Sequence, residues 1–197
     1  MRFTTLLVLM ILVAACGPMP PSDADYVDRM SAARAAKDVA FRNQPAPVPE
    51  ARKSGLLPLL YYPIDRVYDV AAALTPSDDA TARPMIYSDG AVREVRKVGT
   101  LKFLLNGHDL MLSAFVEVGA PEDRLFAPFG DLTNGGETYP AGRLLTVERT
   151  ASGVYDLDFN RAYNPDCYYS PGYSCPVPPK ENRLPVAIQA GERIKAH

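Results

Sequence analysis

The side chains best suited to acid–base chemistry lie near the end of the chain, in the stretch DLDFNRAY. Alternation along a strand places Tyr155, Leu157 and Phe159 on one face and Asp156 and Asp158 on the other. Two interpretations are open: the polar face is in water, or it lines a polar cleft. In the second case the two carboxylates would raise one another's pKa and could form an acid–base pair.

More polar and aromatic residues follow in the proline-rich segment 163–184, which we expect to pack across the fold as a rigid cover. Tyrosine offers flat apolar area with a polar tip, and asparagine and arginine offer directional hydrogen bonds. These residues either bind a ligand or satisfy the backbone of the cover. The candidate cluster is Asp158, Asn160, Arg161, Tyr163, Asn164, Glu181 and Asn182, with Tyr168, Tyr169 and Arg183 beside it.

Two classes of function fit this cluster. The first is a binding or interaction module that takes an unknown small molecule or envelope component. The alternative is a carboxylate-dependent, hydrolase-like enzyme with Asp158 or Glu181 as base, in a cleft under residues 163–184. Convergence of Asp158, Asn164 and Glu181 in one deep pocket would favour the enzyme, and a flat tyrosine surface would favour binding. We assign no catalytic residue.

Cys167 and Cys175 form a second pair with chemical potential. Two cysteines in one short loop indicate a disulfide in an oxidising compartment, and free thiols or a metal site are the alternatives. Zinc would need four tetrahedral ligands, whereas this chain has two nearby thiols and only two histidines, His108 and His197. We therefore expect a disulfide, with no metal and no cofactor.

Composition and motifs exclude several other classes. The net charge is −2 and the basic residues are scattered, so no nucleic-acid partner is expected. The glycine-rich stretch GDLTNGGETYPAG lacks the Gly-Lys-Ser/Thr ending of a phosphate-binding loop. A Ser-His-Asp triad would need His108, which the pattern places at a turn.

The N-terminus has the layout of a secretory leader: Arg2, an apolar run, then small residues. The four residues at 13–16, Val-Ala-Ala-Cys, resemble a bacterial lipobox. The resemblance implies cleavage after residue 15 and a lipid on Cys16, followed by a tether at 16–21. Several acyl chains would anchor the protein to the membrane. Gly17 resembles the pattern of lipoproteins sent to the outer membrane, so we expect the bacterial cell envelope, facing the periplasm.

The elements that must position these residues follow the tether. Residues 22–44 predict a helix and linker, with Ser22 as N-cap and aspartates in the first turns. Its apolar stripe is narrow, so we expect it to dock weakly or to act as a spacer. Residues 45–197 predict a β domain. Its expected strands are 68–74, 83–88, 92–99, 101–105, 108–118, 124–129, 142–148, 154–160 and 185–190.

Asn106-Gly107 predicts a hairpin within LKFLLNGHDLMLSAFVEV. A two-residue turn pairs Leu101 with Leu112 and Phe103 with Leu110, whereas a four-residue loop shifts every pair by two residues. Both registers place the same apolar set inward. Because no β-α-β alternation appears, we predict a mainly β fold, an antiparallel barrel or sandwich with an N-terminal helix.

The stretches LFAPFGDLTNGGETYPAGRLLTV and DLDFNRAYNPDCYYSPGYSCPVPPKENRLPVAIQAGE resemble the family called domain of unknown function 1684. The shared features include the Asp-Phe-Asn-Arg-Ala-Tyr-Asn-Pro run, the cysteine pair and a Pro-Pro-x-Glu-Asn ending. The resemblance covers roughly residues 30–193. The family pattern has glycine where this chain has Pro140, which would stiffen the turn after Tyr139. The resemblance implies a shared fold and no established activity.

The lipid anchor leads to a direct test. We expect Cys16→Ser to abolish lipidation, because the thioether needs the thiol, and to release or mislocalise the protein. Labelled fatty-acid incorporation and membrane fractionation measure both effects. A variant that still takes up label and stays in the membrane fraction would refute the anchor.

Overall fold

A computed structural model describes residues 22–79, 81–120 and 124–195 of the chain. The expected leader, Cys16 and the tether at 16–21 lie outside the described residues. The elements are α1 (Asp23–Asn43), α2 (Glu50–Leu56), η1 (Arg66–Tyr68), β1 (Asp69–Pro76), β2 (Ala82–Ile86), β3 (Val92–Leu105), β4 (His108–Glu117), β5 (Leu125–Phe129), β6 (Arg143–Arg149), β7 (Tyr155–Asp158), η2 (Phe159–Arg161), α3 (Asp166–Tyr169) and η3 (Lys180–Asn182).

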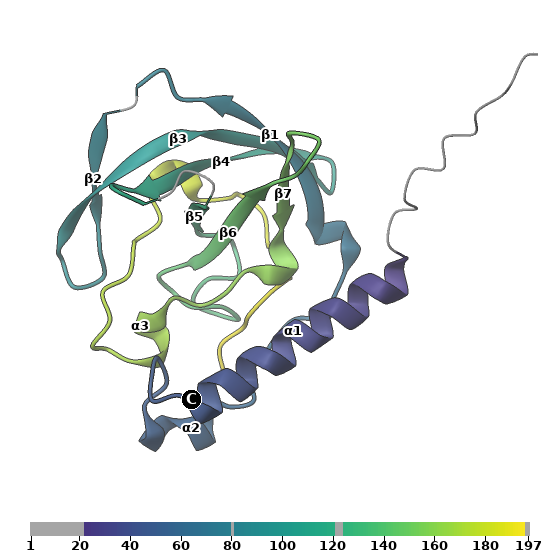
Figure 1. The fold of residues 1–197 in the computed structure, drawn as a ribbon, viewed down its shortest axis with the longest axis vertical. Coiled ribbons are helices and arrows are strands. Elements are labelled where there is room, and N and C mark those ends of the chain that lie inside the picture. Colours follow the sequence, from purple (N-terminus) through teal and green to yellow (C-terminus); the bar gives the residue numbers. More distant parts are fainter. Residues whose placement is uncertain (1–21, 80, 121–123, 196–197) are drawn as a thin grey trace, which may run out of the picture.

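Six antiparallel strands close into a barrel in the order β1-β7-β6-β5-β4-β3, because β1 also pairs with β3. The remaining strand, β2, extends the sheet beyond the barrel at the edge of β3. The prediction of a mainly β fold is therefore confirmed, as a barrel (Figure 1). None of the described helices is long and apolar enough to cross a membrane.

The β3–β4 hairpin has the register of the two-residue turn. Leu101 pairs with Leu112, and Phe103 pairs with Leu110. Asn106 has a φ of 49°, the left-handed conformation that an Asn-Gly hairpin turn needs.

β3 is one strand of 14 residues, although the sequence pattern suggested two separate strands at 92–99 and 101–105. Its first half pairs with β2 and its second half with β1, and the ladder to β4 shifts between Lys97 and Gly99. A Cβ on Gly99 would lie 2.4 Å from the carbonyl oxygen of Thr75. Glycine at this position therefore lets β1 approach β3 closely enough to close the barrel.

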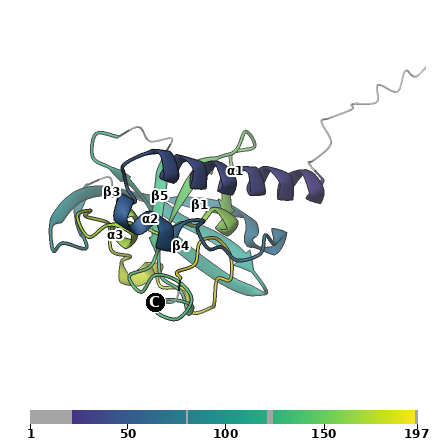
Figure 2. The ribbon, with the colours of Figure 1, turned by 90° about the horizontal axis from the view of Figure 1, so that it is seen from below.

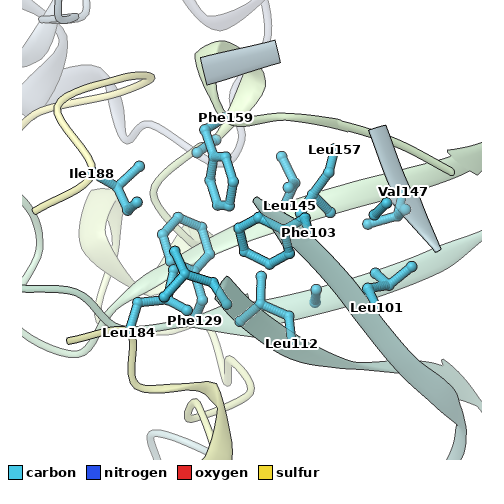
Figure 3. Packing of buried hydrophobic residues seen from close by; sticks show 14 of the residues in the cluster. Leu101, Phe103, Leu112, Phe129, Leu145, Val147, Leu157, Phe159, Leu184 and Ile188 are labelled. Carbon is cyan, nitrogen blue, oxygen red and sulfur yellow. The ribbon is translucent and has the colours of Figure 1, made fainter. Parts of the chain in front are cut away.

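The barrel interior is filled by aliphatic and aromatic side chains from every wall (Figure 3). Phe159 packs edge-on against Phe129, with ring centroids 5.4 Å apart. Leu184 and Ile188 reach the same core from the C-terminal segment, which enters one end of the barrel.

The prediction of a strand at 185–190 is wrong, because this segment has no strand partner. The buried side chain of Arg143 binds it instead, donating to the carbonyl oxygens of Ile188 (2.8 Å), Ala190 and Glu192 (3.2 Å). The same guanidinium pairs with Asp131 at 2.9 Å. One side chain thus replaces the hydrogen bonds of a strand.

Residues 163–184 cross from β6 to β2 as a covering segment. Tyr163 exchanges two backbone hydrogen bonds with Leu144 of β6, of 2.9 and 3.0 Å. Farther along, Val177 donates to the carbonyl of Ile86 in β2 at 2.9 Å. Backbone bonds therefore hold the segment at Tyr163 and again at Val177.

α1 begins with a capping box, in which Ser22 and Asp25 each accept a hydrogen bond from the other's backbone. The helix lies along one side of the barrel (Figures 1 and 2). Only Tyr26 and Met30 of the helix are buried, so polar contacts described below contribute much of its docking. Beyond it, the short helix α2 occupies residues 50–56, for which no helix was predicted.

Arg143 provides a test of this fold. We expect Arg143→Met to lower the free energy of unfolding by about 3–5 kcal/mol, because it leaves the Asp131 carboxylate and three carbonyls without their donor. Urea unfolding measures the change. Arg149→Met, at the exposed end of β6, is the control, with an expected change of about 0.5 kcal/mol or less. Equal losses in the two variants would contradict this role of Arg143.

Candidate functional site

A cleft of about 200 Å³ separates α1 from the barrel, and we call it the α1 cleft. It is lined by Met30, Ala33, Arg34, Lys37, Tyr61, Asn160, Arg161, Ala162, Tyr163 and Glu192. The lining thus comes from the first helix, the segment before β1, the stretch after β7 and the C-terminal segment.

Glu192 is the most buried charged group of the cleft, with 1% of the residue exposed. Its carboxylate accepts from the ammonium of Lys37 at 2.5 Å and from the backbone N–H of Asn164 at 2.8 Å. The hydroxyls of Tyr169 and Tyr61 also donate to this carboxylate, that of Tyr61 at 3.5 Å. Burial and the charge of Glu192 raise the pKa of both phenols, so both stay protonated and donate.

Gly191 allows Glu192 to reach this position. It has a φ of +75°, and a Cβ here would lie 2.5 Å from the carbonyl oxygen of Ala162 and 2.8 Å from that of Phe159. Only glycine fits so close an approach in this conformation. The next N–H, that of Glu192, then donates to the Ala162 carbonyl at 2.9 Å.

The ammonium of Lys37 lies among aromatic rings. Its Nζ is 5.1 Å from the ring centroids of Phe41 and Tyr163 and 5.9 Å from that of Tyr169. These faces stabilise a cation, and the Glu192 carboxylate neutralises it. The contact fixes α1 against the C-terminal segment.

Arg34, one helical turn before Lys37, is a half-buried cation with a different environment. Its guanidinium stacks 4.4 Å over the ring of Tyr61 and donates to the carbonyls of Tyr62 (2.9 Å) and Asn160 (3.3 Å). Within the described part of the chain, its Nε has no acceptor and no carboxylate forms an ion pair with it. Burial lowers the pKa of this guanidinium.

Asp158 and Asn160 are buried beneath α1, which corrects the interpretation that their face of the strand is in water. Asp158 accepts from the Tyr26 hydroxyl and from the Asn160 backbone N–H, both at 3.0 Å, and Arg161 Nε lies 3.2 Å from its second oxygen. The side chain of Asn160 bonds the backbone of Asp65 in both directions. The helix therefore covers the polar face and supplies one of its partners.

The expected interaction of Asp156 with Asp158 is also corrected. Asp69 pairs with Asp158 in the β1–β7 ladder and lies diagonally from Asp156, and burial together with a hydrogen bond donated to Asp156 raises the pKa of Asp69. Asp158 is engaged by Tyr26 and Asn160 instead. The strand thus does not bring the two predicted carboxylates together as an acid–base pair.

The other members of the predicted cluster are dispersed. Asn164 joins the Glu192 network, and its side chain donates to the Arg193 carbonyl at 3.1 Å. Asn182 lies between β4 and β5, where its amide bonds Ser113 in both directions and the Pro128 carbonyl. The η3 turn that directs Asn182 inward leaves Glu181 exposed.

The enzyme alternative needed Asp158 or Glu181 beneath residues 163–184. A groove of about 750 Å³ does lie there, between Tyr163 and Pro176, but its only carboxylate among the lining residues of the described chain is Glu117. Glu181 lines a separate pocket beside β2, and Asp158 lies under α1. The convergence that would favour an enzyme is therefore not formed by these residues.

Cys167 and Cys175 are adjacent and unbridged in the structure. The backbone N–H of Cys167 donates to the Cys175 sulfur at 3.0 Å. Burial and the neighbouring Cys167 raise the pKa of Cys175 to about 12. The disulfide stays a prediction, and the reduced Cys175 is a protonated, weakly nucleophilic thiol.

Sequence reasoning missed the residues at the centre of the site: Glu192, Lys37, Arg34 and Tyr61. Gly191 before Glu192 was a signal for close backbone approach, but the partner elements could not be identified from spacing. Lys37 lies on the predicted helix at 22–44, and a helical pattern gives no information about a distant acceptor.

Asp158 leads to a pH prediction. Burial raises its pKa above 3.8, against the effect of hydrogen bonds from Tyr26 and Asn160. Between pH 3.8 and the raised pKa, the folded protein holds a proton that the unfolded chain has lost. The free energy of unfolding therefore falls as pH rises through that window.

Asp158→Asn removes this titration. We expect the free energy of unfolding of the wild type, minus that of the variant, to decrease as pH rises from about 4. Urea titrations from pH 3 to 7 measure it. A difference that is constant or rising with pH would contradict the assignment.

Comparisons with known proteins agree with the fold. A family model described as "Protein of unknown function (DUF1684)" matches residues 57–193. The match was expected to begin at about residue 30, so it starts later than predicted and does not include α1. An uncharacterized protein of Haloarcula marismortui, solved by solution NMR, is 33% identical with a TM-score of 0.68, over 87% of this chain and 95% of that one. The search of curated proteins found no match. The chain therefore belongs to the DUF1684 family of proteins of unknown function.

Proposed function

We propose that the protein is a binding module of the bacterial cell envelope, held at the membrane by a lipid on Cys16, which binds a small anionic group in the α1 cleft. The observation that carries the proposal is Arg34. A half-buried guanidinium without a carboxylate partner in the described chain is costly, and an anion in the cleft would supply the missing charge.

The other charges of the site support an anion. Lys37 is neutralised by Glu192, and Arg161 lies beside Asp158. In formal charge, the three cations exceed the two carboxylates by one positive charge, which is that of Arg34. Guanidinium groups bind carboxylates and phosphates through paired hydrogen bonds, and Arg34 Nε is a donor without an acceptor in the described residues.

The size of the cleft restricts the ligand. About 200 Å³ is less than the ~300–1,000 Å³ typical of pockets that enclose a drug-sized molecule. The cleft therefore fits one carboxylate or phosphate group with a few attached carbons. A larger envelope molecule would insert its anionic end and keep the rest outside.

The position of α1 in the chain supports an envelope ligand. Only six residues separate Cys16 from Asp23, the first residue of the helix that carries Arg34 and Lys37. A lipid on Cys16 would thus place the cleft close to the membrane surface, where phosphate-bearing and carboxylate-bearing molecules are held at high local concentration. Orientation towards the periplasm is part of this proposal.

Arg34→Met tests the proposal. We expect phosphate, acetate and malonate to raise the melting temperature of the wild type at constant ionic strength, because ligands that bind the folded state stabilise it. The variant should bind at least about tenfold more weakly in calorimetry, since a charge-assisted hydrogen bond contributes about 1.5–3 kcal/mol. Arg42→Met, on the exposed surface of the same helix, should bind like the wild type. Equal anion responses in both variants, or none in the wild type, would contradict the proposed site.

A further inference from the structure

An exposed apolar face lies on the outside of the barrel, on β1, β3 and β4. Leu104 is 60% exposed and Met111 54%, and Val154, just before β7, is 40% exposed. These side chains line a shallow groove of about 560 Å³ together with Ala71 and Ala73. In Figure 1 the β3–β4 hairpin and α1 lie on different sides of the barrel, so this face is distinct from the α1 cleft.

Two opposite charges accompany the apolar residues. The ladder pairs Lys102 with Met111 and Leu104 with Asp109, and all four side chains are exposed on the same outer face. Neither Lys102 nor Asp109 forms an ion pair with any residue that the structure describes. Both charges are therefore available to a partner.

The ladder fixes how these four residues are arranged. Paired side chains across two antiparallel strands are about 5 Å apart, and alternate residues along a strand are about 6.8 Å apart. The four positions therefore form a near-rectangle. Lys102 and Asp109 occupy one diagonal, Leu104 and Met111 occupy the other, and the diagonals cross at about 70°.

We propose that this face is the interface between two copies of the chain, related by a twofold axis along the Leu104–Met111 diagonal. Rotation about that axis brings Lys102 of each copy close to Asp109 of the other, within reach of the long lysine side chain. Leu104 and Met111, which lie on the axis, then pack against their own equivalents. A twofold interface must be self-complementary, and this arrangement of charges meets that requirement.

The charge pattern favours a second copy over an unrelated partner. One face that carries a positive and a negative charge on opposite sides of an apolar centre is complementary to itself after the rotation. The apolar centre supplies the attraction, and the two symmetric ion pairs fix the angle between the copies. Because β2 and α1 take no part, each copy keeps its α1 cleft.

Cross-linking of the full chain in cell membranes tests this geometry. Met111→Cys places a thiol near the axis, so a short bis-maleimide should link two copies into a species of twice the mass. The matched control is Leu132→Cys, because the native Leu132 side chain is 70% exposed and lies outside the face. This control also measures the reaction of the native cysteines. We expect at least fivefold more dimer from Met111→Cys.

The charges are tested in the Met111→Cys background. Lys102→Asp should reduce the dimer yield severalfold, because it places two acidic groups opposite each other. The double change Lys102→Asp with Asp109→Lys should restore the yield, since the pairs re-form with exchanged signs. Dimer yields equal to those of Leu132→Cys, a failure of the double change to restore cross-linking, or a product of a different mass would overturn the proposal.

Discussion

The fold depends on one buried cation. The guanidinium of Arg143 donates hydrogen bonds to the carbonyl oxygens of three alternate residues in the C-terminal segment, and the Asp131 carboxylate balances its charge. A segment without strand partners would otherwise bring unpaired carbonyls into an apolar core, at a cost of about 1–3 kcal/mol each. The guanidinium therefore makes it possible for Ile188 to fill the barrel.

The candidate site follows from the same placement. Because the C-terminal segment is fixed in the barrel, Gly191 turns it past Ala162 and delivers Glu192 to the surface covered by α1. Glu192 then fixes Lys37, and Arg34 comes to lie over Tyr61 one turn away. The cleft needs residues from both ends of the described chain. No local sequence motif could therefore predict it. The family match includes Glu192 but excludes the helix that provides the two cations.

The sequence was sufficient for several of the local elements. Asn106-Gly107 determines the hairpin, the alternation of Leu101 and Phe103 determines the inward face, and Ser22 marks the start of α1. Interpretation failed where a distant element changed the environment of a correct local pattern. The polar residues of β7 alternate as expected, but α1 covers their face of the strand. Residues 185–190 have a strand-like composition, but no neighbouring strand pairs with them. Periodicity describes which side chains share a face and contains no information about what covers that face.

The location of the core-filling segment has a consequence for biosynthesis. Leu184, Ile188 and Ala190 lie near the C-terminal end of the described residues, yet they share the core with β1, which begins at Asp69, more than a hundred residues earlier. While the ribosome still holds residues 184–192, Arg143 lacks its carbonyl partners and the barrel remains open at one end. The barrel can therefore close only after the segment that holds Ile188 and Ala190 is free to enter it.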